Sequence, residues 1–386
     1  MRPATSISAF ICDRANYGRL LPLLWGLRSD SRYELKLILG GSFVVERFGS
    51  ACNMLESHQL GPDNGVPCER VYHEIEGDRL ISKALSIGAG VSGYAQALER
   101  QACDWALVIG DRYEALAAAQ AAVYTGRCLV HVQGGEVSGT LDESARHAIT
   151  KLAHYHLPAT FRAMENILLM GEPIDSILAV GCPSADLARR LGEPKRTSDF
   201  RECLVVFHPD GPDPGREFAE LLAAVFDFYW DRVNIWWPNI DAGNHAIVRE
   251  LQNVRQRRQV TTIANETPMR FLQRLRDATV CVGNSSSFVR DAGYFGTPVV
   301  LVGHRQDGRE RGEHVQQVEA ESPAIRMAIG DQLAHGPYPP SELYGRGYIT
   351  KLFLDQLANR PHVIQKRLSY GTKDRPPTAV AADQAA

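Results

Sequence analysis

The densest group of chemically active side chains lies in residues 129–156, LVHVQGGEVSGTLDESARHAITKLAHYH. This stretch holds four of the chain's twelve histidines, together with three carboxylates and three glycines. The paired glycines allow a tight turn with close approach of the backbone to a ligand. Asp142, which follows this turn, can either cap a helix or act on a substrate.

A second acid follows the preceding apolar run, DWALVIGD, where Asp111 and Arg112 stand at the end of an expected strand. A helix is expected to begin at Tyr113, so Asp111 can also be either a cap or a catalytic carboxylate. Loops at the carboxyl ends of neighbouring parallel strands meet in one crevice. We therefore expect Asp111 and Asp142 to converge on one cleft.

The histidines of this stretch do not predict a metal site. His131 lies within an expected strand, His147 lies on an expected helix, and His154 and His156 share one face of the next strand. No closed set of ligands with the usual spacings is visible. We expect no metal and no cofactor, and a structural role for most of these rings.

Familiar motifs of other enzyme classes are weak or missing. The run GAGVSG at residues 88–93 matches the dinucleotide fingerprint, but the residues before it look helical rather than strand-like. We interpret this run as a glycine-broken helix. The sequence has no phosphate loop of the GxxxxGK type, no GxSxG elbow and no HExxH motif, which argues against those kinases and hydrolases.

The second half of the chain carries a candidate anion site, VGNSSSFVRDAG, in which serines follow a strand and begin a helix. Backbone N–H groups, hydroxyls and the positive end of the helix dipole suit a diphosphate, although one serine can serve only as a cap. Asp291, one turn later, can accept hydrogen bonds from a ribose diol. Further polar residues at expected strand ends are His208, Asn239, Arg305, Arg309 and Arg311.

The elements that must position these residues are short apolar runs alternating with helical segments, a pattern typical of an α/β fold with parallel, Rossmann-like sheets. The length of 386 residues predicts two domains. A polar, charged stretch separates a first domain at 1–190 from a second at 200–350. Expected strands are SISAFIC, YELKLILGG, ERVYHEI, DWALVIGD, CLVHVQG, HYHLPAT and SILAVG, then CLVVFHP, IWWPN, TTIAN, TVCVGNS and PVVLVG.

Composition and termini narrow the classes further. A net charge of −3 gives no electrostatic reason to expect nucleic acid or membrane partners. The N-terminus reads as a first strand rather than a signal, and the eight cysteines are scattered singly, so we expect a cytoplasmic protein with reduced thiols. The tail at residues 371–386 has almost no apolar bulk and is expected to be disordered.

The chain resembles the hydrolysing UDP-N-acetylglucosamine 2-epimerases, above all the epimerase half of the bifunctional enzyme of sialic acid synthesis. The resemblance spans about residues 8–350 and rests on DRANYG, GDRYEAL, GGEVSGTLDESARHAITKLAHYH, VGCPS, PNIDAG, GNSS and FGTPV in this order. It implies a GT-B-like pair of Rossmann-like domains, a C-terminal helix at 351–370 that returns to the first domain, and a homodimer or homotetramer. It also implies elimination of UDP from a sugar nucleotide, followed by hydration of the glycal.

The same resemblance assigns roles to single residues. Asp111 and Asp142 match catalytic carboxylates, and Arg112, Gln133 and His208 are grouped with them. The residues that match nucleotide and diphosphate contacts are Arg14, His208, Asn239, Ser285, Ser286 and Arg305, with Asp291 at the ribose position.

Several positions depart from the family pattern. Gln133 replaces a family Glu that exchanges protons, which a carboxamide cannot do. Phe43 and Ile109 replace histidines, Phe288 replaces a common glycine, and Asp291 replaces a longer glutamate. This set of changes is expected to touch both the reacting sugar and the nucleoside.

Three functions are therefore open. The default is a hydrolysing 2-epimerase that cleaves the anomeric C–O bond of a nucleoside diphosphate sugar or related sugar pyrophosphate. The second is a glycosyltransferase that passes the sugar to an acceptor such as a nucleobase. The third is an inactive sugar-nucleotide binding protein, against which the retained Asp111 and Asp142 count.

Overall fold

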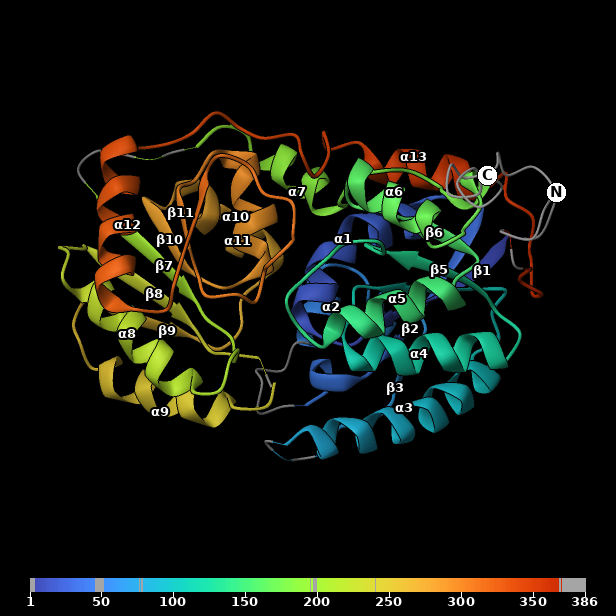
Figure 1. Cartoon of the computed structure of the whole chain (residues 1–386). Coiled ribbons are helices and arrows are strands. Elements are labelled where there is room, and N and C mark those ends of the chain that lie inside the picture. The colour runs from blue at the N-terminus through green and yellow to red at the C-terminus, as the bar shows by residue number, and fades with distance from the viewer. Residues whose placement is uncertain are drawn as a thin grey trace, which may run out of the picture.

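The computed structural model of the protein describes residues 4–369 apart from residues 46–51, 76, 78, 195, 197–199, 240 and 368. The described chain forms two six-stranded parallel sheets, each flanked by helices (Figure 1). The predicted α/β class with two Rossmann-like units is confirmed. The tail expected to be disordered lies outside the described residues.

The first sheet has the strand order β3-β2-β1-β4-β5-β6. The order reverses between β1 and β4, where loops at the carboxyl ends diverge and open a crevice. Its strands are β1 (Thr5–Ile11), β2 (Tyr33–Leu39), β3 (Cys68–Arg70), β4 (Trp105–Ile109), β5 (Cys128–Val132) and β6 (Tyr155–Leu157). The helices of this half are α1 (Arg14–Ser29), α2 (Asn53–Ser57), α3 (Leu80–Arg100), α4 (Tyr113–Tyr124), α5 (Asp142–Leu152), α6 (Phe161–Leu169) and α7 (Ser184–Leu191).

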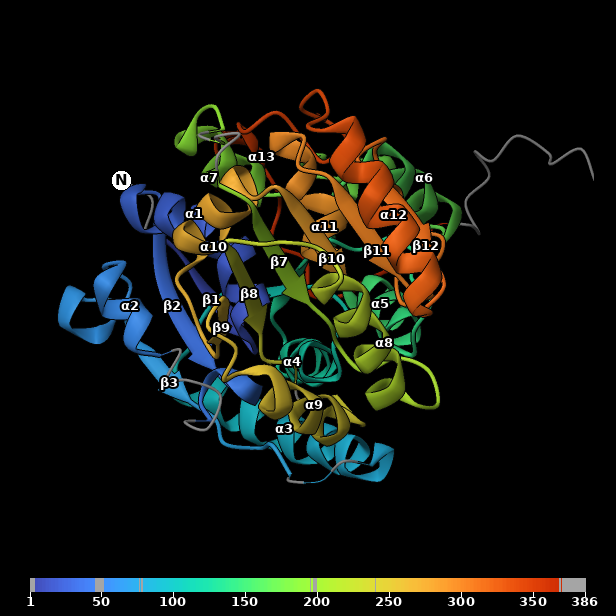
Figure 2. The ribbon, with the colours of Figure 1, turned by 90° about the vertical axis from the view of Figure 1, so that its left-hand side faces the viewer.

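The second sheet repeats this design with the order β12-β11-β10-β7-β8-β9. Helices α8, α9 and α12 pack on one face of it, and α10 and α11 lie on the other (Figure 2). Its strands are β7 (Glu202–Val206), β8 (Arg232–Trp236), β9 (Val260–Ile263), β10 (Val280–Gly283), β11 (Val299–Val302) and β12 (Val315–Val318). Its helices are α8 (Pro214–Phe226), α9 (Asn244–Val254), α10 (Pro268–Asp277), α11 (Ser286–Arg290) and α12 (Ser322–His335).

Central strands and helix starts follow from local sequence. Every residue of β4, β5 and β7 is buried, because helices cover both sheet faces and favour continuous apolar runs. Asp13 caps α1 by accepting a hydrogen bond from the Asn16 backbone N–H at 2.8 Å, and Asp213 caps α8 in the same way. These caps hold both helices close behind the strand ends that line the crevice.

One apolar core runs through both domains. It contains Tyr17 and Leu20 of α1 together with Leu272 of α10 and Phe288 of α11. Burial of these side chains fixes the two sheets relative to each other, since separating them would expose apolar surface to water. The crevice between the strand ends therefore has walls from both domains.

The C-terminal part of the chain returns to the first domain. Helix α13 spans Ile349–Leu357. The Tyr33 hydroxyl donates to the Leu354 carbonyl of this helix at 2.7 Å. Asp186 of α7 accepts from the first backbone N–H groups of α13. Residues beyond it run beside β6, where the Tyr155 hydroxyl donates to the Pro361 carbonyl at 2.8 Å. The helix is shorter than the predicted 351–370, because the chain before a proline disfavours helical backbone.

Three other predictions of elements differ from the structure. Helix α3 runs unbroken through residues 88–93, where Gly90 and Gly93 allow close packing against His73, Ala117 and Val71. The segment SILAVG makes only a single bridge, His156 to Ile177, and β3 covers only the start of ERVYHEI. Strand β12 was not predicted. Within the described residues no helix has both the length and the apolar character needed to cross a membrane.

Candidate active site

Two adjoining cavities occupy the crevice between the sheets. The aromatic cavity, of about 810 Å³, is named for Trp236, Trp237 and Phe271 in its wall. The carboxylate cavity, of about 690 Å³, contains Asp111 and Asp142. Ala15, Arg19, His208, Asn239, Ser285 and Ser287 line both. Every residue to which the family resemblance assigns a catalytic or nucleotide-binding role lines at least one of the two. Arg311, which the sequence also placed near the anion site, lines neither and contacts Gln317.

The two predicted carboxylates do not serve as helix caps. Leu141 and Arg112 occupy the cap positions of α5 and α4, and neither uses its side chain as a cap. Asp111 accepts a hydrogen bond from Arg146, which is buried one turn along α5 from Asp142. Both carboxylates line the carboxylate cavity and are available to a ligand there.

The carboxylates have opposite pKa shifts. Burial raises the pKa of Asp142 to about 6, and the charge of nearby Asp111 adds to this shift. Burial alone would raise the pKa of Asp111 too, but Arg146 and Arg309 hold that pKa below its usual range. At neutral pH Asp111 stays ionised while Asp142 exchanges its proton readily. Pairs separated in this way commonly divide acid–base roles in enzymes.

A cage of arginines surrounds a carboxylate that the sequence analysis did not single out, Glu136. Arg290 and Arg309 both form ion pairs with it, and Arg146 donates to its backbone carbonyl at 2.8 Å. Burial opposes ionisation of Glu136, but Arg290 and Arg309 lower its pKa to about 2. With Asp111 and Glu136 ionised, these three arginines leave an excess of positive charge beside the cavity, which suits an anionic ligand.

Gln133 is held at the end of β5 in an unusual backbone conformation, with φ of 65°. Its side-chain oxygen accepts from Arg290 Nη1 at 3.1 Å, and its amide nitrogen donates to Cys182 Sγ at 2.9 Å. The residue is buried but borders the carboxylate cavity. Both ends of its side-chain amide are thus bonded to protein groups, Arg290 and Cys182.

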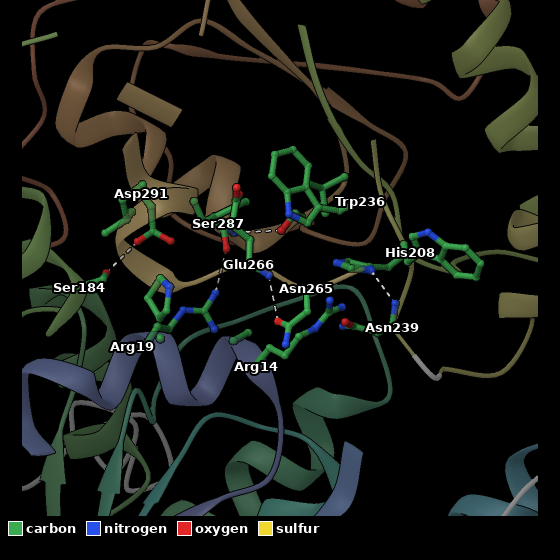
Figure 3. A pocket seen from close by; sticks show the side chains of 18 residues that line it. Arg14, Arg19, Ser184, His208, Trp236, Asn239, Asn265, Glu266, Ser287 and Asp291 are labelled. Carbon is green, nitrogen blue, oxygen red and sulfur yellow. Dashed lines mark hydrogen bonds between the residues drawn. The ribbon is translucent and has the colours of Figure 1, made fainter. Parts of the chain in front are cut away.

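His208 stands where the two cavities meet. Burial and the charge of Arg305 lower its pKa to about 3, so the ring is neutral. The backbone N–H of Asn239 donates to Nδ1 at 3.1 Å, which assigns the ring proton to Nε2 (Figure 3). The Asn284 side chain fixes the backbone of His208. Its Oδ1 accepts from the His208 N–H at 2.8 Å, and its Nδ2 donates to the His208 carbonyl at 2.9 Å. His208 is thus a preorganised N–H donor.

The serine turn before α11 faces a cation from the first domain, Arg19. Ser285 is the cap of α11 and accepts from the Ser287 N–H, so the capping alternative holds for one serine. Arg19 Nη2 donates to Ser286 Oγ at 2.8 Å. It also donates to Ser287 Oγ at 3.5 Å (Figure 3). This contact brings a guanidinium from α1 to the shared wall of the cavities.

Arg112, Arg305 and Arg14 have distinct surroundings. Arg112 Nη1 donates to Asp241 Oδ1 at 2.8 Å and its guanidinium also contacts Asp13 and Glu114. We interpret it as a link between domains, since three carboxylates already surround it. Arg305 lies 3.6 Å from Asp241, and Arg14, whose pKa burial lowers, lines the aromatic cavity.

The aromatic cavity combines flat apolar walls with polar edges. Trp236 meets the Phe271 ring edge-on at 5.3 Å between centroids. Asn265 and Glu266 contribute polar groups, and Asp291 accepts from Ser184 Oγ at 2.7 Å at the far end (Figure 3). Such a mixture suits a planar heterocycle with a sugar hydroxyl nearby. The paired tryptophans of IWWPN, at a strand end, were the sequence signal for this wall.

Three of the family departures lie outside the cavities, contrary to expectation. Phe43, Ile109 and Phe288 are each at most 1% exposed and belong to the apolar core. Phe43 packs against the Tyr17 ring at 5.3 Å. These apolar side chains turn inward because the core offers them dry surroundings. Only Gln133 and Asp291 of the departures border a ligand space.

The histidines of residues 129–156 have structural partners. His131 Nε2 contacts the Gly110 carbonyl at 2.8 Å and steadies the turn before Asp111. His154 bridges the Leu129 N–H and the Ile364 carbonyl, His156 lies 3.4 Å from Glu172, and His147 contacts Glu143. Across the described ranges no group of three or more His, Cys, Asp or Glu side chains is arranged to hold a metal ion.

Two Rossmann-like domains with the ligand space between their strand ends place the protein in the GT-B-like structural class. Within that class the chain belongs to the UDP-N-acetylglucosamine 2-epimerase family, which matches residues 26–358.

Two curated relatives have similar length. The UDP-N,N'-diacetylbacillosamine 2-epimerase (hydrolyzing) of Legionella pneumophila is 30% identical, over 86% of this chain and 90% of that protein. The UDP-N-acetylglucosamine 2-epimerase of Neisseria meningitidis is 26% identical, over 86% of this chain and 89% of that protein.

Solved structures share the fold. The UDP-GlcNAc 2-epimerase of Neisseria meningitidis bound to UDP-GlcNAc superposes with a TM-score of 0.72 at 17% identity, covering 92% of this chain and 100% of that one. The Methanocaldococcus jannaschii enzyme in complex with UDP-GlcNAc and UDP gives 0.74 at 15% identity, covering 92% and 99%.

Proposed function

We propose that the protein is a hydrolysing UDP-sugar 2-epimerase, which eliminates UDP from a UDP-2-acetamido sugar and then hydrates the glycal. The observation that carries the proposal is the carboxylate pair with opposite pKa shifts, in a cavity that also holds a neutral histidine donor and arginines. The similarity to a hydrolysing 2-epimerase along most of the chain supports it.

The two cavities suggest how the substrate lies. The base fits the aromatic cavity, where Trp237 and Phe271 offer apolar faces and Asp291 is near enough to serve the ribose. The diphosphate then crosses the shared wall, within reach of Arg19 and His208. This arrangement leaves the sugar in the carboxylate cavity with Asp111 and Asp142.

The proposed reaction has two steps. Asp142 takes the proton from carbon 2, a double bond forms between carbons 1 and 2, and UDP leaves with the electron pair of the C1–O bond. His208 and the arginines stabilise the charge that develops on the diphosphate. Asp142 releases this proton to solvent. Water then adds across the double bond: its hydroxyl bonds to carbon 1 and its proton goes to carbon 2 on the opposite face, with Asp111 holding the water. Asp142 suits the first step because its pKa of about 6 lies near neutral pH.

The sugar itself can be larger than N-acetylglucosamine. A hollow of about 1460 Å³ adjoins the carboxylate cavity and shares Asp142 and Arg305 with it. Apolar residues such as Ile87 and Leu116 line this hollow. A second acylamino group on the sugar, as in the substrate named for the Legionella relative, would find room there.

Assembly and location are part of the proposal. The first half of α3 presents Ile81 and Leu85, each 53% exposed, which favours burial in a homodimer or homotetramer. All eight cysteines are free thiols, which fits the reducing cytoplasm. The glycosyltransferase and inactive-binder alternatives gain no specific support, because the carboxylate pair is present and Gln133 is occupied by protein contacts.

The proposal is tested by incubating the purified protein with UDP-N-acetylglucosamine, and separately with UDP-N,N'-diacetylbacillosamine, in deuterated water. Release of UDP with deuterium at carbon 2 of the epimerised sugar is the expected result. Release of UDP with an unlabelled carbon 2 would show simple hydrolysis instead. Binding of the UDP-sugar without release of UDP would show an inactive binding protein.

A further inference from the structure

A continuous chain of hydrogen bonds joins the two cavities through the protein interior. Arg290 Nη1 lies 3.1 Å from Gln133 Oε1, Gln133 Nε2 lies 2.9 Å from Cys182 Sγ, and Cys182 Sγ lies 2.9 Å from Ser184 Oγ. Ser184 Oγ in turn lies 2.7 Å from Asp291 Oδ1. The chain starts at the carboxylate cavity and ends at the aromatic cavity.

The proton positions along this chain follow from its ends. A guanidinium only donates, so Gln133 accepts from Arg290 through its oxygen and must present its amide N–H to Cys182. The thiol proton is then free to donate to Ser184. The hydroxyl of Ser184 donates to the carboxylate of Asp291. Every donor thus points the same way, from a cation to an anion, and such chains polarise one another favourably.

The thiol remains protonated inside the protein. Burial raises the pKa of the Cys182 thiol, with the charge of Asp291 acting in the same direction. Cys182 itself is fully buried and lines neither cavity. It can pass on hydrogen bonds but does not contact a ligand.

This chain gives a physical reason for a glutamine at position 133. One oxygen of a carboxylate there would accept from Arg290, but its second oxygen would lie against Cys182 and could only accept a hydrogen bond from the thiol. The thiol proton would then turn away from Ser184, and the hydroxyl of Ser184 would lose its donor. Of the two side chains, only the carboxamide accepts at one end and donates at the other at neutral pH.

We propose that Gln133, Cys182 and Ser184 form a positioning relay that couples the nucleoside end of the site to its sugar end. The relay fixes Arg290 beside the sugar and Asp291 beside the nucleoside, so that a change at one end is felt at the other. None of its three members transfers a proton in the reaction. The naming of UDP as the nucleotide rests on the proposed function, whereas the relay itself rests on the contacts above.

Cys182→Ala cuts the relay at a residue that no ligand touches. We expect the dissociation constant for UDP, measured by calorimetry, to rise about fivefold, the scale of one net hydrogen bond. Cys182→Ser restores a group that accepts and donates, and should bind UDP within about twofold of the wild type. Cys128→Ala, a fully buried cysteine on β5 outside the relay, is the matched control and should leave UDP binding unchanged.

A double-mutant cycle separates coupling from general loosening. Gln133→Leu and Asp291→Asn alter side chains at opposite ends of the relay, so their effects on UDP binding should be coupled by about threefold or more. Arg290, which contacts Gln133, directly precedes Asp291 in the chain, so coupling past the relay is the competing explanation. In a Cys182→Ala background the coupling should vanish, and coupling that persists there would overturn the relay. Additive effects in the wild-type background would overturn the relay while leaving the proposed function standing.

Failure of the proposed function is recognised separately, in the wild type, because no epimerised sugar would then form from either UDP-sugar. If the wild type also fails to bind UDP, the same cycle measured by urea unfolding tests the relay, since the hydrogen bonds exist without ligand. Coupling of Gln133→Leu and Asp291→Asn in the free energy of unfolding, lost with Cys182→Ala, would support the relay, and additivity would reject it.

Discussion

The carboxylate cavity and the aromatic cavity share a wall but are built from opposite materials. The first is lined by ionised groups such as Asp111, which pairs with Arg146 behind it, and Arg290, which pairs with Glu136. The second is lined by aromatic rings and mostly neutral polar groups. Charges in the first can stabilise transition states, whereas rings in the second can only bind. Changes to the first should therefore alter turnover or folding, and changes to the second should alter affinity.

The largest effect is expected from Asp142→Asn in the carboxylate cavity. An amide of the same shape cannot take the proton from carbon 2, so kcat should fall about 10²- to 10⁴-fold. Binding of UDP should stay within about twofold, because we propose that the nucleotide lies in the other cavity. Initial rates of UDP release and calorimetry measure the two quantities. Unchanged kcat would remove Asp142 from the chemistry.

Glu136→Leu should lower the free energy of unfolding, because Glu136 holds the arginines beside the carboxylate cavity. It leaves Arg290 and Arg309 buried without their common counter-ion, which costs about 3–5 kcal/mol in the free energy of unfolding. Urea unfolding at neutral pH measures this loss. The exposed pair Arg346–Glu342, at 2.8 Å, is the control, and Glu342→Gln should cost less than about 1 kcal/mol. Similar losses in both variants would show that the arginine cage adds no stability.

Trp237→Leu, in the aromatic cavity, should lower the affinity for UDP and leave turnover unchanged. Loss of a flat ring against the base is expected to weaken UDP binding about tenfold, the scale of one stacking contact. Turnover at saturating substrate should change little. Inhibition by inorganic pyrophosphate, which has no base, serves as the internal control and should be unaffected. A drop in kcat with unchanged affinity would contradict the division of roles.

The smallest effect is the pH dependence set by Asp142. Burial and the charge of Asp111 raise its pKa to about 6, and a base must be ionised to act. The rate kcat/KM should therefore rise about twofold from pH 6 to pH 7 and fall with unit slope well below pH 6. The Asp142→Asn variant should lack this step. A flat profile in the wild type would show that Asp142 is not the titrating base.

The same shift has a consequence for stability. The folded pKa of Asp142 lies above that of an unfolded aspartate, so the folded protein keeps a proton that the unfolded chain releases. The contribution of this group to the free energy of unfolding is therefore present at low pH. It is lost as pH rises from about 4 to about 6.

Sequence patterns were sufficient for most strands of the two sheets and for placing Asp111 after β4 and Asp142 after β5, because both depend on local periodicity. The arginine cage around Glu136 could not be predicted from the sequence, since Arg290 and Glu136 are 154 positions apart in the chain. Strand β12 was missed because the two glutamines of VQQV hide its apolar signal. Phe43 and Phe288 show that a residue aligned with a site need not face it, since side-chain direction depends on packing. The short α13 shows that Pro361 outweighed the helical pattern before it.

The return of the chain to the first domain makes that domain discontinuous in sequence. Lys366 donates to the Lys151 and Ala153 carbonyls at the end of α5, the helix that starts with Asp142. The domain synthesised first is therefore completed last, after the entire second domain has left the ribosome. Its folding must wait for contacts more than 200 residues apart in sequence, which slows the search for the native state. A protein shortened by a few dozen C-terminal residues would keep Asp111 and Asp142 but lose the contacts that Lys366 makes at the end of α5.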